Sequence, residues 1–155
     1  MRGRLRILRT IHGQIKGPIP HLNLELEMGI QELCLDAIKK GIIKSAHDLS
    51  DGGLAVNISE SIVHSKPGLG AKLDVVRKLR DDELVFGECQ SVIVVSLEEA
   101  ALYELILLAQ KLDVHTQTIG RVTDKESLVI NDLINIPRKK MESAFFNTLE
   151  KILAK

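Results

Sequence analysis

The sequence predicts an α/β (α+β) fold in which helices cover a mixed sheet. Segments with apolar residues at helical spacing alternate with short β-branched segments, and turns rich in glycine, proline or asparagine separate them. The chain has 155 residues, 45% of them apolar, which is enough for one ordinary domain with a real core. We therefore expect an N-terminal extension or connector at residues 1–20 and a single domain at residues 21–155.

The first 20 residues fit no element well. Residues 1–16 carry apolar positions that suit either a strand or a short helix, and both readings stay open. The Gly-Pro-Ile-Pro segment at 17–20 cannot continue a helix, because proline lacks the N–H and restricts its neighbour. A connector is the expected role for this segment.

The first long helix is expected to begin after Asn23, a good N-cap residue. Lys39 and Lys40 suit the negative end of the helix, and Gly41 suits the left-handed conformation that often follows it. The apolar face predicted to be buried consists of Leu26, Ile30, Leu33, Ala37 and Ile38. Cys34 is expected to join the core.

Strand, turn and helix are expected next, at residues 42–46, 47–52 and 53–64. A short strand is predicted at 71–75, residues 76–84 are ambiguous, and residues 92–96 read as a buried β-branched strand. Ser96 and Glu99 have capping-box spacing for a further helix. The apolar face of that helix is expected to contain Leu97, Ala101, Leu105, Leu108 and Leu112.

The last third predicts a strand at 115–122 and two short strands, 127–130 and 133–136, around the Asn131-Asp132 turn. Pro137 suits the first turn of a final helix. That helix is expected to bury Met141, Phe145, Leu149 and Ile152.

Charge and composition exclude several classes of function. The 21 basic and 21 acidic residues cancel, and no long run of one sign occurs, so nothing favours nucleic acid or a membrane surface as a partner. The basic N-terminus lacks an apolar stretch of signal-peptide length, and no apolar run approaches transmembrane length. Two distant cysteines without a CxxC motif suit a reduced protein, so a cytoplasmic location is expected.

One polar turn lies between the expected strand at 42–46 and the helix that follows. It contains Asp48, Ser50, Asp51, Gly52 and Gly53. Free N–H groups and the dipole at the start of a helix favour an anion, and acids beside them favour a phosphate with its metal ion. The alternative is that Asp51 only caps the helix after a turn.

A second polar turn follows Gly87 and contains Glu88, Cys89, Gln90 and Ser91. Acids from two such turns could hold one divalent cation on a phosphorylated ligand, and Gln90 could bind an amide or a ribose hydroxyl. The hypothesis that His47 and Asp48 form a general base is weaker, because neighbouring residues in a strand point to opposite faces of the sheet. Neither a GxSxG elbow nor histidines at zinc-binding spacing occur.

Four sequence segments resemble the phosphoribosylformylglycinamidine synthase family, whose large subunit acts in purine biosynthesis. They are the SAHDLSDGGLA segment at 45–55, FGECQS at 86–91, NLELE at 23–27 after Gly-Pro-Ile-Pro, and IGRV at 119–122. The similarity runs from about His12 to the C-terminus. It identifies the chain as similar to the C-terminal domain of the second half of that enzyme, with the fold shared by aminoimidazole ribonucleotide synthase C-terminal domains.

The resemblance implies a part of an ATP-dependent ligase that makes formylglycinamidine ribonucleotide from formylglycinamide ribonucleotide. It implies Mg²⁺ and ATP as cofactors of the whole enzyme, and the N-terminal domains and an ammonia-supplying glutaminase subunit as partners. A homodimer is left open. The isolated chain is expected to be inactive and to hold no catalytic residue.

Carried over to this sequence, the resemblance makes Asp48 a magnesium ligand. The same comparison assigns nucleotide or substrate binding to Ser50, Asp51, Gly52, Gly53, Glu88, Cys89 and Gln90. Two departures bear on that assignment, because Cys89 replaces the usual serine and Val92 replaces an arginine found in many relatives. A stand-alone binding or assembly module remains an alternative, as does the C-terminal domain of selenophosphate synthetase or thiamine-monophosphate kinase.

Overall fold

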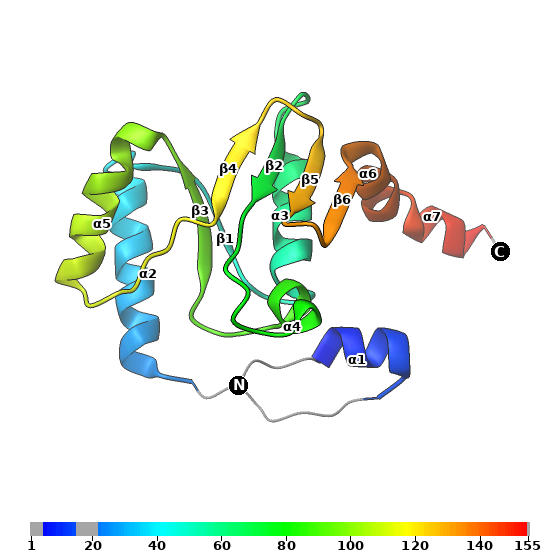
Figure 1. Ribbon diagram of the computed structural model, residues 1–155, viewed down its shortest axis with the longest axis horizontal. Coiled ribbons are helices and arrows are strands. Elements are labelled where there is room, and N and C mark those ends of the chain that lie inside the picture. The colour runs from blue at the N-terminus through cyan, green and yellow to red at the C-terminus, as the bar shows by residue number, and fades with distance from the viewer. Residues whose placement is uncertain (1–4, 15–21, 155) are drawn as a thin grey trace. The chain divides into compact units, whose positions relative to one another are not determined.

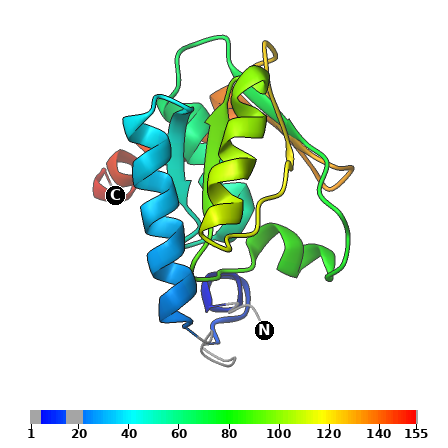
Figure 2. The same ribbon diagram turned by 90° about the vertical axis from the view of Figure 1, so that its left-hand side faces the viewer.

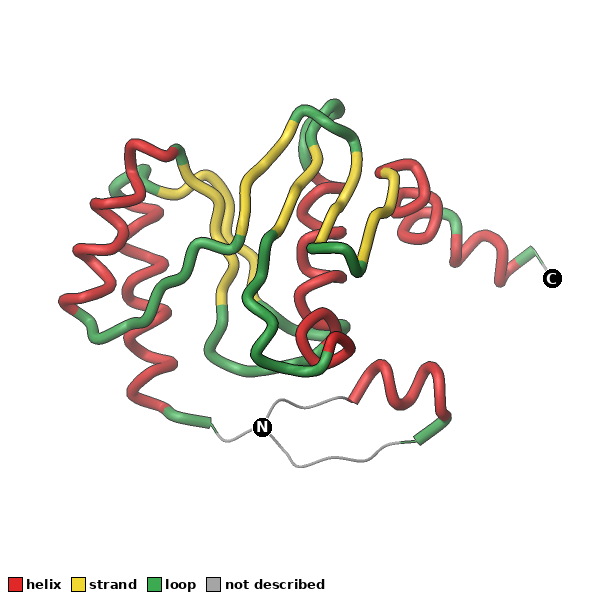
Figure 3. Tube along the Cα trace, viewed as in Figure 1, coloured by secondary structure: helices red, strands yellow, loops and turns green. Residues whose placement is uncertain are grey.

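The computed structural model describes residues 5–14 and 22–154 (Figure 1). The chain divides into two compact units. The first unit comprises Met1–Asn57 and Asp82–Thr118, and the second comprises Ile58–Asp81 and Ile119–Lys155. Helices and strands intermix along the chain, as the tube view shows (Figure 3). The predicted α/β class with a mixed sheet is confirmed.

In the first unit, two helices cover one face of a pair of antiparallel strands. Helices α2 (Leu24–Lys39) and α5 (Leu102–Lys111) lie side by side in front of β1 (Ile43–Asp48) and β3 (Ile93–Leu97) in Figure 2. Their contact with the strands forms the core of the unit, because each helix turns an apolar stripe inward. The buried cluster contains Leu33, Ala37, Ile42, Ile43, Leu105 and Ala109.

Helix α2 begins and ends as predicted. Asn23 Oδ1 accepts hydrogen bonds from the N–H groups of Glu25 and Leu26, at 3.1 and 3.2 Å. Gly41 has φ +69°, the left-handed conformation expected after the helix. The predicted burial of Leu26 and Ile38 is wrong, because 37% and 53% of these residues are exposed.

Helix α5 begins later than predicted. Ser96 remains in β3, where its Oγ lies 2.6 Å from Ser45 Oγ, and a 3₁₀ turn, η1 (Glu99–Ala101), precedes α5. The capping-box prediction is therefore wrong. The predicted apolar residues do pack against the buried cluster around Leu105, namely Leu97, Ala101, Leu108 and Leu112, but Leu97 lies in β3 and Ala101 in η1 rather than in the helix.

The second unit contains the mixed sheet, in the order β4 (Gly120–Thr123), β2 (Gly70–Leu73), β5 (Ser127–Ile130) and β6 (Ile134–Pro137). Strands β2 and β5 run parallel, and the other two pairs are antiparallel. Leu128 and Ile130 are fully buried on β5. The predicted strand at 115–122 is shorter than expected, because pairing begins only at Gly120.

The remaining helices differ more from expectation. The ambiguous N-terminal segment contains α1 (Leu5–His12), and the ambiguous segment after β2 ends in α4 (Asp81–Phe86). Helix α3 (Gly53–His64) has the predicted bounds. The expected connector at 17–20 lies outside the described residues. In the part of the chain that the structure describes, no helix has both the length and the apolar character needed to span a membrane.

The predicted single helix after Pro137 is two helices, α6 (Arg138–Phe146) and α7 (Thr148–Leu153). Met141 is buried, but Phe145 and Ile152 are 46% and 63% exposed, so their predicted burial is wrong. The side chain of Leu149 lies outside the described residues. In the sequence, the helical spacing of apolar residues continues through Asn147. In the structure, the helical backbone is interrupted at that residue.

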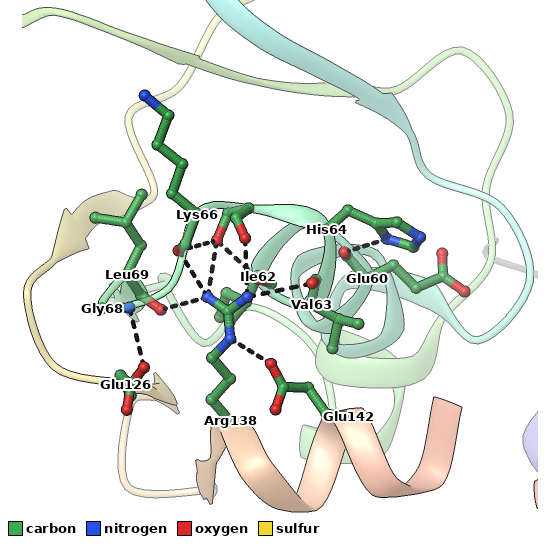
Figure 4. Close-up of polar contacts among 11 residues, drawn as sticks. Glu60, Ile62, Val63, His64, Lys66, Gly68, Leu69, Glu126, Arg138 and Glu142 are labelled. Carbon is green, nitrogen blue, oxygen red and sulfur yellow. Dashed lines mark hydrogen bonds and ion pairs between the residues drawn. The ribbon is translucent and has the colours of Figure 1, made fainter. Parts of the chain in front are cut away.

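Arg138 is the unexpected polar residue of the second unit, only 5% exposed (Figure 4). Its guanidinium donates to the carbonyls of Val63, Ser65, Lys66 and Leu69, around the end of α3, and its Nε donates to Glu142 Oε1 at 2.7 Å. Carbonyls at a helix end lack partners within the helix, so the guanidinium satisfies them.

Candidate functional site

The two polar turns predicted to act together lie side by side in the first unit. Because β1 and β3 are antiparallel, the end of β1 lies beside the beginning of β3, with Asp48 opposite Ile93. The pairing continues one step further, since the N–H of Leu49 donates to the carbonyl of Val92 at 2.8 Å. The turn at 49–53 and the turn at 87–91 are therefore neighbours.

A hydrogen bond joins the two turns directly. The N–H of Gly52 donates to Glu88 Oε1 at 3.1 Å, just before α3 begins. This N–H lies at the N-terminal end of α3, and the N-terminal end of a helix attracts negative charge. A carboxylate is therefore stabilised there. Glu88 thus supplies the anion at a position where the sequence predicted a ligand phosphate.

Gly53 shows how closely the turns approach. Its φ is +68°, and a Cβ placed there would lie 2.6 Å from the carbonyl carbon of Phe86 and 2.8 Å from the oxygen of Gly87. Side chains disfavour both the conformation and the contact, so this position requires glycine. The glycine therefore lets two backbones touch.

Asn57 fixes the end of β1 and was not identified from the sequence. It is 2% exposed, and its Nδ2 donates to the carbonyl of Asp48 at 2.7 Å and lies 2.9 Å from His47 Nδ1. The main-chain oxygen of Asp48 also lies 2.9 Å from that ring nitrogen. The available signal was a polar residue on the otherwise apolar face of α3 that contains Leu54 and Ile58.

His47 and Asp48 do not form a close side-chain pair. His47 Nδ1 lies 3.8 Å from Asp48 Oδ1, which is within ion-pair reach but too long for a hydrogen bond. The Asp48 side chain is 75% exposed. Within 5–14 and 22–154, no three His, Cys, Asp or Glu side chains gather closely enough to hold a metal ion.

Glu27 and Ser91 attach the second turn to α2. Ser91 Oγ donates to Glu27 Oε2 at 2.6 Å, and Gln31 Nε2 donates to Glu27 Oε1 at 2.8 Å. The hydroxyl of Ser91, and then the amide of Gln31, hold the pKa of Glu27 below its ordinary value of 4.5. Nothing in local spacing connects residues 64 positions apart, so the sequence did not predict this contact.

The other predicted binding residues surround this junction at different depths. Ser50, Asp51 and Gln90 are exposed, whereas Cys89 is half-buried. Both cysteines of the chain are thiols. The structure therefore brings the two predicted turns together, with Gly52, Gly53 and Glu88 at their contact and the exposed side chains around it.

Comparison with known proteins gives a family. Residues 10–132 match the model of the family described as AIR synthase related protein, C-terminal domain. Over 124 residues the chain is 37% identical to the phosphoribosylformylglycinamidine synthase subunit PurL of Alkaliphilus metalliredigens, covering 80% of this chain and 16% of that protein. It is 33% identical to the corresponding subunit of Moorella thermoacetica, covering 99% of this chain and 21% of that protein.

Two solved structures share the fold. Thermotoga maritima PurL complexed with ATP matches with a TM-score of 0.68 and 21% identity, over 91% of this chain and 24% of that chain. The PurLQS structure from the same organism matches with a TM-score of 0.68 and 19% identity, over 91% of this chain and 25% of that chain. The chain therefore spans about a fifth of the length of the relatives it matches.

Proposed function

This chain belongs to the family of AIR synthase-related C-terminal domains, and from that premise we propose that it is the C-terminal domain of a phosphoribosylformylglycinamidine synthase. On this proposal it forms part of an ATP-dependent ligase of purine biosynthesis. The ligase converts formylglycinamide ribonucleotide to formylglycinamidine ribonucleotide. The domain spans residues 21–155, and residues 1–20 connect it to the preceding part of the enzyme.

The observation that best supports the proposal is the junction of the two turns. The segments of the sequence that resemble the ligase, 45–55 and 86–91, are distant along the chain. They meet through the hydrogen bond from Gly52 to Glu88 and the backbone contact at Gly53. A contact that unites the family's two motifs is expected when both serve one site.

On the same proposal, substrate or nucleotide lies against this junction, with Ser50, Asp51 and Gln90 exposed toward it. Asp48 supplies one carboxylate to a magnesium ion whose other ligands come from phosphate oxygens and water. The residues of this chain position the ligand, and the chemistry of the ligase needs ATP and domains outside this chain. The isolated chain is proposed to be inactive.

The proposed partners follow from the relatives. The N-terminal domains of the same enzyme complete the site, and a glutaminase subunit supplies ammonia to the complex, as the family resemblance implies; the matched Thermotoga maritima structure is of PurLQS. A cytoplasmic location accompanies this role.

A stand-alone assembly module is the second candidate. It is favoured by the bond from Gly52 to Glu88, because a carboxylate from the chain itself already lies at the start of α3. An anionic ligand would compete with that carboxylate. If the chain is an assembly module, it retains the fold of the family, but its site binds no nucleotide.

Complementation separates the two candidates. A phosphoribosylformylglycinamidine synthase truncated before the matching C-terminal region is mixed with the purified chain, magnesium, ATP, glutaminase, glutamine and formylglycinamide ribonucleotide. We expect formylglycinamidine ribonucleotide to form only when both parts are present. Calorimetric titration of the chain with magnesium-ATP is the second measurement.

The first proposal fails if the mixture shows no turnover although the two parts co-purify. Co-purification without turnover, together with no heat on titration of magnesium-ATP, supports the assembly module. A truncated enzyme complemented by its own separated C-terminal region is the control, because it shows that the split itself preserves activity.

A further inference from the structure

Helix α2 carries two apolar stripes on opposite sides. The inner stripe packs against the core of the first unit through Leu33 and Ala37. The outer stripe is exposed: Leu24 and Met28 are 66% and 70% exposed, and Leu35 and Ile38 are more than half exposed. A single exposed leucine is ordinary, but a continuous apolar stripe on a surface helix marks a contact with another molecule.

The spacing of the outer stripe is that of a coiled-coil seam. Its positions are Leu24, Met28, Gln31, Leu35 and Ile38, separated by four, three, four and three residues. An open groove follows the same face, lined by Met28, Gln31, Glu32, Leu35, Asp36 and Lys39. This face therefore suits a second helix packed alongside α2.

The seam is also close to symmetric about Gln31. Apolar residues lie seven and three positions before it, and four and seven positions after it. When an identical helix packs in the opposite direction, Leu24 of one copy lies near Ile38 of the other, and the two Gln31 side chains meet near the twofold axis. Such self-complementarity is what a twofold interface requires.

The charges beside the seam favour the antiparallel arrangement. Glu25, Glu32 and Lys39 repeat every seven residues along one edge of the outer stripe, so the acidic end of the helix and its basic end share that edge. Antiparallel pairing brings Lys39 of one copy to Glu25 of the other at both ends of the seam, and the two Glu32 side chains face each other near its centre. In a parallel pair this edge faces the opposite edge of the partner helix, where Lys39 meets Cys34 and no acid, so the attraction between Lys39 and Glu25 is lost.

We propose that the outer stripe of α2 is a self-association surface, occupied by α2 of a second copy of this chain in antiparallel orientation. The occupant is a second copy because both the apolar spacing and the charges complement themselves. The proposal goes beyond the proposed function and does not depend on it.

Sedimentation velocity of the full chain between about 5 and 200 µM tests self-association, since this range covers the weak affinity of a small interface. We expect a concentration-dependent shift from monomer to dimer. Met28→Glu and Leu35→Glu should raise the midpoint concentration by about tenfold or more. The matched control is Tyr103→Glu on α5, which is 71% exposed and outside the stripe.

Charge exchange tests the orientation. Glu25→Lys or Lys39→Glu alone should weaken the dimer, and the double variant should restore it. A Gln31→Cys variant, with Cys34 and Cys89 changed to serine, should form a disulfide-linked dimer on mild oxidation. Far-ultraviolet circular dichroism checks that every variant is folded.

The proposal is overturned if the folded wild-type chain stays monomeric to the highest concentration. It is also overturned if Met28→Glu and Leu35→Glu leave the dimer unchanged. Failure of the charge exchange to restore association would overturn the antiparallel arrangement. None of these results depends on nucleotide binding or on complementation of the ligase, so they leave the proposed function to its own test.

Discussion

The hydroxyl of Ser91 donates a hydrogen bond of 2.6 Å to the carboxylate of Glu27, and this contact ties the second polar turn to the first turn of α2. Ser91 has φ +57°, a left-handed conformation that is costly for a residue with a side chain. The bond to Glu27 helps to hold it there. The contact places α2, which is the helix of the proposed dimer, next to the candidate site within the same unit.

This contact predicts a pH dependence of stability. Because the pKa of Glu27 is lowered in the folded chain, the ionised carboxylate stabilises the fold above its unfolded pKa, near 4.5, and that contribution is lost as the pH falls through the lower folded pKa. Thermal unfolding of the wild type and of Glu27→Gln, compared from pH 7 to pH 3, measures it. The stability difference should be constant above about pH 5.5 and shrink below about pH 4.5.

Ser91→Ala provides the control for that measurement. Because Ser91 is the main cause of the lowered pKa, the effect of Glu27→Gln should depend less on pH in a chain that also carries Ser91→Ala. An unchanged pH dependence in the double variant would mean that the hydroxyl does not stabilise the carboxylate.

The backbone contact at Gly53 predicts a large cost of adding one methyl group. Gly53→Ala places a Cβ 2.6 Å from the carbonyl carbon of Phe86 in a left-handed conformation, so unfolding free energy should fall by about 3 kcal/mol or more. Gly41→Ala is the matched control, because Gly41 has φ +69° with nothing within 4 Å of the added Cβ. It should cost only about 1 kcal/mol.

Urea denaturation of the two glycine variants measures both values. The comparison isolates the contact between the turns from the cost of the conformation, which the two positions share. Equal destabilisation by the two variants would show that the turns can separate without loss, which would count against one rigid junction.

The local parts of this fold could be predicted from sequence, and the long-range contacts could not. The ends of α2 and the bounds of α3 depend on neighbouring residues, such as the Asn23 cap and Gly41. The two polar turns were found because each has a distinctive composition. Their bond through Glu88 depends on the pairing of β1 with β3, which local patterns do not specify.

Two of the missed residues have partners that lie far along the chain. Glu27 binds Ser91, and Arg138 binds carbonyls more than 65 residues earlier. The prediction of one helix after Pro137 is wrong for a local reason. Apolar residues keep a helical spacing through Asn147, so the sequence pattern does not indicate the interruption of the helix there.

Arg138 gives the clearest stability prediction in the second unit. Arg138→Lys retains the charge, but the lysine ammonium lacks the planar fork of N–H groups with which the guanidinium binds several carbonyls at once. The free energy of unfolding should therefore fall by about 2–4 kcal/mol. Lys139→Ala changes an exposed neighbour in the same helix and should have little effect. Full rescue by lysine would show that charge, rather than the geometry of the guanidinium, stabilises the end of α3.

Asp48 tests the role of the candidate site in the proposed ligase. Its exposed carboxylate is the proposed magnesium ligand, and we expect an auxiliary site because the resemblance is to the second half of the enzyme. In the complemented enzyme, Asp48→Ala should reduce turnover by less than about tenfold, because the proposed function places catalysis outside this chain. Asp51→Ala, an exposed acid in the same turn, is the comparison. A loss of about a thousandfold for Asp48→Ala alone, with the variant folded and co-purifying, would instead place the chemistry at this junction.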